Sequence, residues 1–128
     1  MAIELSRLEA GIYHCELAGL VTLDDIIDTQ QQGLTIAEDH DDDAHVLILS
    51  VDPRVKMPFD IRRTSELVDN NHAAAILVVG ATLHVRFIAS MMTRLFSKLG
   101  TVEHQRTVSR AVERARDILR QRTKLAAD

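Results

Sequence analysis

The chain contains one cysteine, no tryptophan and no long apolar run, and each of these shortages excludes a class of protein. A single cysteine, Cys15, cannot form an internal disulfide or supply a set of zinc ligands. No stretch reaches the ~18 apolar residues that a membrane-spanning helix needs, and the first residues lack the basic and apolar regions of a signal peptide. We therefore expect a cytoplasmic protein with no membrane span.

Aromatic side chains and positive charge are also scarce. The sequence has one Tyr and three Phe, so few side chains are available to stack on nucleic-acid bases. The formal net charge is −4 at pH 7, whereas a dedicated nucleic-acid binder needs a coherent positive surface. The composition therefore argues against nucleic acid as a partner.

Aliphatic residues are plentiful. The 128 residues are 46% hydrophobic, which is enough to build one core without metals or disulfides. The almost uninterrupted apolar run VLILSV at 46–51 is typical of a parallel strand that is buried on both faces. Pro53 lacks a backbone donor and ends this strand, which leaves Asp52 exposed at its carboxyl edge. We predict a single domain over residues 1–128, organised around this strand.

Local signals predict the remaining elements. Residues 2–9 and 12–18 alternate between apolar and polar around Ala10-Gly11, which indicates a hairpin. Thr22 and Asp25 have the spacing of a capping box and begin a helix from Leu23 to about Ala37.

Helices and buried strands alternate after the central strand. We predict a polar helix over 59–71, a strand over 73–79, a helix capped by Thr82, an edge strand over 102–106 and a last helix capped by Thr107 or Ser109. The order β-β-α-β-α-β-α-β-α predicts an α/β fold whose mixed sheet has a parallel centre.

Four segments carry a resemblance to a known family: GLVTLDD at 19–25, VLILSVD at 46–52, AAAILVVG at 73–80 and the stretch 107–119 that begins TVSRA. They resemble the STAS superfamily, and within it the SpoIIAA-like branch that is linked to Sec14/CRAL-TRIO lipid-binding domains. The resemblance implies a non-enzymatic binding or regulatory module that needs no cofactor and often forms homodimers. In the family's anti-sigma-factor antagonists a Ser at the start of the second helix is phosphorylated, but residues 57–60 carry no hydroxyl.

The binding surface is expected at the carboxyl edge of the parallel strands, where ligands and partners of such sheets gather. The residues that we assign to it are Asp52, Arg54, Lys56, Phe59, Asp60, Thr82 and His84. The partner is then an unknown regulatory protein. An alternative is a carrier of a small apolar ligand or lipid, held between the sheet and the helix side chains Phe87, Met91, Met92 and Phe96.

The helix after Thr82 is apolar on nearly all sides, and a sheet face can cover only about half of it. The stripe Phe87, Met91 and Leu95, spaced at i, i+4, is left for a second copy of the chain. We therefore predict a homodimer with this stripe in its interface.

Catalytic and metal sites are not predicted. The acidic stretch 38–43, EDHDDD, lacks the ligand spacing of calcium or zinc sites and is interpreted as a solvated loop. Ser50, Asp52 and His84 suggest a hydrolase, but the segment around Ser50 lacks the glycines of a nucleophile elbow, so we expect the backbone to satisfy its hydroxyl. The six His residues are scattered, and most are expected at the surface or at sheet edges.

The last helix is basic. Arg110, Arg114, Arg116 and Arg120 are repeated at i, i+4, which is unfavourable for an isolated helix. These arginines either dock against an acidic surface or form a solvated face with Glu113 and Asp117, and we favour the solvated face. The expected buried side includes the stem of Arg122.

Overall fold

The computed structural model of the chain describes residues 3–57, 66, 69, 72–80, 82–95 and 101–127. Within the helices, the side chains of His84, Ile88, Met92, Leu95 and residues 124–127 lie outside this description. The elements are β1 (Ile3–Glu9), β2 (Ile12–Leu17), α1 (Leu23–Asp39), β3 (Val46–Val51), β4 (Ala75–Val79), α3 (Leu83–Leu95), β5 (Thr101–Gln105) and α4 (Val108–Ala127). Of the helix predicted over 59–71, only Glu66 and Asp69 are described, and both are helical.

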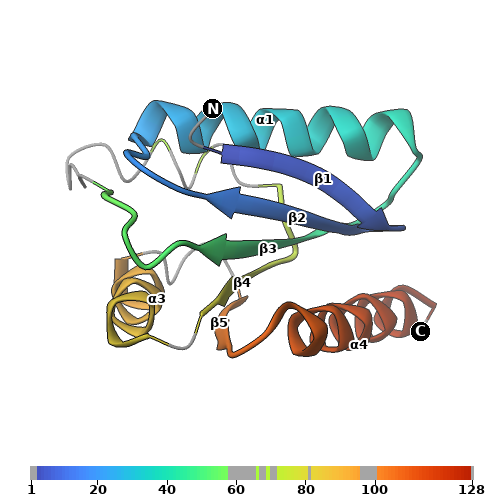
Figure 1. Cartoon of the computed structure of the whole chain (residues 1–128). Helices are drawn as coiled ribbons and strands as arrows, with labels where there is room; N and C mark the ends of the chain where they lie inside the picture. Colours follow the sequence, from blue (N-terminus) through green and yellow to red (C-terminus); the bar gives the residue numbers. More distant parts are fainter. Residues whose placement is uncertain are drawn as a thin grey trace.

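The five strands form one sheet in the order β1-β2-β3-β4-β5. The β1-β2 hairpin is antiparallel, and every later neighbour is parallel. This arrangement confirms the predicted α/β fold with a parallel centre and matches a SpoIIAA-like topology. Figure 1 shows α1 along β1, α3 beside the arrowhead ends of the strands, and α4 toward the opposite end of the molecule.

Local signals place the helix boundaries. Asp25 N donates to Thr22 Oγ1 at 3.2 Å and Thr22 N donates to Asp25 Oδ2 at 2.9 Å, which confirms the capping box of α1. Thr107 Oγ1 accepts from Arg110 N at 3.2 Å, so Thr107 is the cap of α4. No described helix is long and apolar enough to cross a membrane.

Helices pack against both faces of the sheet. On one face α1 and α3 pack against the strands, with Tyr13, Cys15 and Leu47 among the buried residues. Burial raises the pKa of Cys15 to about 12, so its thiol stays protonated in the core. On the other face the described packing comes from α4, through Ala111, Ala115 and Ile118.

Two arginines fasten α4 to the sheet on opposite flanks. Arg114 binds Glu103 of β5 through Nε at 3.0 Å and Nη2 at 2.9 Å. Arg116 binds Glu9 of β1 through Nε at 3.1 Å and Nη2 at 2.7 Å. Arg114 and Arg116 therefore dock on carboxylates of the sheet, as in the less favoured prediction, although Arg116 is also exposed. Arg110 and Arg120 are exposed, as the favoured solvated face predicts. Arg122 is exposed as a whole residue, and burial of its stem alone stays a prediction.

The central strand ends where the sequence predicts. Pairing of β3 stops at Val51, and Asp52 is exposed. The Asp52 carboxylate accepts a hydrogen bond from Arg54 N at 2.7 Å, which holds the turn after the strand. The predicted turn at Asp52-Pro53 is confirmed.

Two glycines allow a matched test of the hairpin turn. Gly11 and Gly19 both have positive φ, 75° and 69°, so alanine at either position costs about 1–2 kcal/mol. A Cβ at Gly11 would also lie 2.8 Å from the Ala44 carbonyl oxygen. A Cβ at Gly19 would have no atom within 4 Å apart from those of its chain neighbours. We expect Gly11→Ala to lower the free energy of unfolding by at least ~1 kcal/mol more than Gly19→Ala in equilibrium urea unfolding. Equal losses would contradict this close packing of the turn.

Candidate functional site

The predicted binding surface lies at the arrowhead ends of the parallel strands, as Figure 1 shows for the segment after β3 and for α3. Asp52, Arg54 and Lys56 are exposed there. Thr82 is exposed and caps α3, since its Oγ1 accepts from Val85 N at 3.3 Å. The predicted site residues Phe59 and Asp60, and the side chain of His84, lie outside the described residues.

The backbone of this edge is held by pairing between two loops. Lys56 N donates to Gly19 O at 2.8 Å, and Val21 N donates to Lys56 O at 2.8 Å. Val55 is buried in the core between the exposed Arg54 and Lys56. The two cations therefore project into solvent from a fixed backbone.

Large apolar side chains are exposed at the same end, and the sequence prediction identified only part of them. Leu83 is 81% exposed and Phe87 is 66% exposed, one helical turn apart at the start of α3. Leu20, which follows β2, is 58% exposed. Met91 of the predicted dimer stripe is half-buried, and the Leu95 side chain is outside the description. The i, i+4 spacing of Leu83 to Phe87 is the sequence signal that places Leu83 on the same apolar stripe.

We define the rim as Asp52, Arg54, Lys56, Thr82, Leu83 and Phe87. These side chains come from the loop after β3 and from the first two turns of α3. The rim combines apolar side chains with charged and hydroxyl groups. They lie in the loop that follows β3 and at the start of the helix that follows β4. Such a surface can bind a partner, but it has no nucleophile activated by a base.

Ser50 pairs with a histidine that the sequence analysis did not connect to it. Ser50 Oγ lies 2.6 Å from His14 Nε2 across neighbouring strands, and both residues are half-buried. The expectation that the backbone satisfies Ser50 is therefore wrong. A Ser–His contact of this length suits a nucleophile and its base. However, β3 pairs with strands on both sides, so its amides are used in the sheet and are not arranged as an oxyanion hole.

The register extends this polar pair into a small open area on the α4 side of the sheet. Glu16 is opposite both Glu4 of β1 and Ser50 of β3, and His14 is opposite Ser6. Because residues that pair directly share a face, all five side chains lie on one side of the sheet. Glu4, Ser6 and Glu16 are exposed, so α4 leaves this part uncovered.

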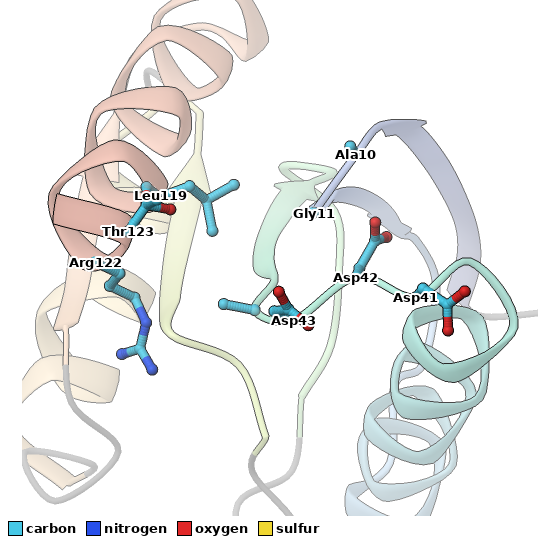
Figure 2. Close-up of a pocket in the computed structure, with 9 residues that line it drawn as sticks. Ala10, Gly11, Asp41, Asp42, Asp43, Leu119, Arg122 and Thr123 are labelled. Atoms are coloured by element: carbon cyan, nitrogen blue, oxygen red, sulfur yellow. The ribbon is translucent and has the colours of Figure 1, made fainter. Parts of the chain in front are cut away.

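A cavity of about 500 Å³ lies at the other end of the sheet, between the acidic loop and α4. Its lining includes Asp41, Asp42 and Asp43 on one side and Leu119, Arg122 and Thr123 on the other. Figure 2 shows Arg122 on the α4 side and Asp43 on the loop side of the gap. Asp41 and Asp43 are exposed, as expected for a solvated loop. In the described segments no group of three His, Cys, Asp or Glu side chains could hold a metal ion.

Asp42 differs from its neighbours, and the expectation that it is solvated is wrong. Its side chain is 6% exposed and receives hydrogen bonds from Arg7 Nε at 3.1 Å and from the Tyr13 hydroxyl at 2.7 Å. The Arg7 guanidinium is the largest cause that lowers the pKa of Asp42 to about 2. Asp42 therefore ties the loop to β1 and β2.

His45 is a second residue for which the surface expectation is wrong. It is buried, and its ring stacks on Tyr13 with centroids 4.9 Å apart and planes 19° apart. Burial, with the nearby charge of His72, lowers the pKa of His45 below its ordinary value. The two rings join the start of β3 to the Asp42 network.

Comparison with known proteins gives no assignment for either end of the sheet. No protein-family model matches the chain, and no curated protein matches its sequence. The functional argument therefore depends on the surfaces described above.

The Asp42 network predicts a specific loss of stability. A pKa near 2 in place of 3.8 makes ionised Asp42 worth roughly 2 kcal/mol to the folded state. This contribution is complete above pH 3.8 and is lost as the pH falls toward 2. Asp42→Asn is expected to lower the free energy of unfolding at pH 7 by roughly 2 kcal/mol, measured in urea. Asp43→Asn is the control, since it changes an exposed carboxylate in the same loop and should shift stability by less than ~0.5 kcal/mol. Equal effects of the two changes would disprove the network.

The buried His45 predicts a weakening of the fold in mild acid. Its pKa lies below 6.5 in the folded protein, so the unfolded chain binds a proton that the folded chain resists. Stability is therefore complete above pH 6.5 and declines as the pH falls below that value. His45→Phe keeps a ring beside Tyr13 and removes the titration, so its unfolding free energy should decline less than that of the wild type between pH 7 and pH 5. His40→Gln, at the exposed end of α1, serves as the control. Parallel pH profiles for the wild type and His45→Phe would count against this role.

Proposed function

We propose that the chain is a non-catalytic binding or regulatory module of the SpoIIAA-like STAS type that acts through the rim. The observation that carries this proposal is the exposure of Leu83 and Phe87 in the first two turns of α3. Adjacent large apolar side chains held in water are typical of surfaces that a partner covers.

The charged part of the rim supports a protein partner. Arg54 and Lys56 are exposed beside a loop backbone that is already paired, and within the described part of the chain neither forms an ion pair. Protein interfaces commonly combine an apolar centre with a polar edge. A preformed backbone also reduces the conformational entropy that binding would cost.

The same exposure favours this module over the alternative of an apolar-ligand carrier. A carrier that uses Phe87 would hold this ring inside a pocket, but the ring is 66% exposed. On the α1 and α3 face of the sheet, the space between the described elements is filled by packed side chains such as Tyr13, Leu47 and Val85.

We propose further that the partner which covers Leu83 and Phe87 is a second copy of the chain, so that a regulatory partner binds the charged part of the rim. Leu83, Phe87 and Met91 follow one another at i, i+4 on α3, and the first two are exposed. A two-fold contact between two such stripes buries the apolar side chains of both copies with one surface. The dimer then presents two sets of Asp52, Arg54 and Lys56 to a regulatory partner.

Light scattering at micromolar concentration tests this arrangement. The wild type is expected to give the mass of a dimer, whereas Phe87→Glu and Met91→Glu are expected to give a monomer, because each places a charge in the apolar contact. Leu8→Glu is the matched control: Leu8 is also an exposed leucine, at 45%, but it lies on β1 at the far end from the rim, so the dimer should persist.

Two results would count against the proposal. A monomeric wild type, or a dimer that tolerates both charges in α3, would show that the stripe is not an interface. Mass spectrometry of a solvent extract from the same purified protein addresses the carrier alternative, since a stoichiometric lipid would support it.

A further inference from the structure

We propose that the uncovered part of the α4 side of the sheet, over β1 and β2, is a second docking surface, for a cationic helix of another protein. We call it the acidic sheet face and define it as Glu4, Ser6, His14, Glu16 and Ser50. It borders the rim, because Glu16 and Ser50 line a hollow of about 360 Å³ together with Asp52. It consists of other residues than the rim, however, and this inference does not depend on the function proposed above.

The acidic sheet face continues the surface on which α4 lies. Along β2 and β3, the residues on the α4 side change from apolar to polar toward the arrowhead end. Ile12 and Val46 pair beneath α4 and are fully buried, followed by His14 beside Ile48 and then Glu16 beside Ser50. Figure 1 agrees, because α4 lies toward the starts of these strands and away from their arrowheads. Among the described helices, α4 therefore covers one part of this face and leaves Glu4, Ser6 and Glu16 exposed.

The way in which α4 binds the covered part indicates what the open part can accept. The side of α4 that meets the strands carries Ala111 and Ala115, which let the helix approach closely. From its two flanks Arg114 and Arg116 each bind a carboxylate of the sheet, Glu103 and Glu9, through two nitrogen atoms. A helix with small residues between flanking arginines is therefore already a ligand of this sheet face.

The uncovered part of this face also carries glutamates, but unlike Glu9 and Glu103 they are not bound by an arginine of α4. Glu4 and Glu16 are directly opposite each other on β1 and β2, and both are exposed. Like charges in this position repel each other. In the described part of the chain, neither one forms an ion pair. A cation placed between them would relieve the repulsion and gain charge-assisted hydrogen bonds.

The chemistry of the neighbours also favours a cationic protein segment. Ser6 is an exposed hydroxyl, and the paired His14 and Ser50 form a half-buried polar floor beside the two glutamates. A second copy of the same face is excluded by charge, because it would place four carboxylates together. A segment with arginine or lysine on its flanks complements the surface in charge and hydrogen bonding.

The test uses the full chain and a fluorescent synthetic peptide with the sequence of residues 108–127, which carries the required arginine spacing. Peptide binding is measured by fluorescence anisotropy at low salt. The protein variant Glu4→Gln/Glu16→Gln is expected to weaken binding by about five- to thirtyfold, since two exposed ion pairs are lost. A peptide with Arg114→Gln/Arg116→Gln should bind weakly to the wild type and show little further loss with the variant.

The matched control is Asp41→Asn/Asp43→Asn, which also removes two exposed carboxylates but at the opposite end of the sheet. It should leave the affinity within about twofold of the wild type, and amide NMR shifts caused by the peptide should concentrate at the acidic sheet face. Circular dichroism checks that both variants are folded. The inference is overturned if the peptide does not bind, if the control variant weakens binding equally, or if the shifts concentrate elsewhere.

Discussion

Burial of the central strand β3 on both faces is the constraint on which the rest of the structure depends. Alternate residues of the strand point to opposite sides, so Leu47 needs cover from α1 and Ile48 needs cover from α4. Only crossovers that place helices on both sides of the sheet meet this need, and parallel pairing of β3 with β2 and β4 follows from them. Ala111 and Ala115 of α4 contribute to this burial, because their small side chains let the helix pack closely over Val46 and Ile48 of β3.

The distribution of charge follows from this packing. A helix that is apolar toward the sheet must carry its arginines on the flanks or the outer side, and two of them reach carboxylates of β5 and β1. The Arg116 guanidinium lowers the pKa of Glu9, which keeps that pair ionised. The buried residues that α4 packs against the sheet are apolar, and partly exposed ion pairs add little stability, so these pairs orient the helix more than they stabilise it. Carboxylates beyond the reach of α4, Glu4 and Glu16, stay exposed and give the sheet a second surface with a charge of its own.

The two ends of the sheet differ in how their polar groups are satisfied. At the amino-terminal end of the parallel strands, Asp42 is enclosed by Arg7 and Tyr13, and His45 stacks on the same tyrosine. These groups satisfy one another and stabilise the fold. At the carboxyl end the backbone is just as well paired, but Arg54, Lys56, Leu83 and Phe87 are left exposed. Preformed backbone with unsatisfied side chains is what a binding surface requires, which is why the proposed function is assigned to this end.

The sequence by itself determined the order of the elements, because their signals are local: the capping box of Thr22 and Asp25, the Gly11 turn and the arrest of β3 before Pro53 each act over a few residues. It also placed Asp52, Arg54 and Lys56 after the carboxyl end of β3, where they are exposed. Only the tertiary structure decided the partners of Ser50 and Asp42, since His14 is 36 residues from Ser50 and Arg7 is 35 residues from Asp42. Periodicity tells which residues of one strand share a face, but the register between strands and the docking of α4 select which distant side chains meet on that face.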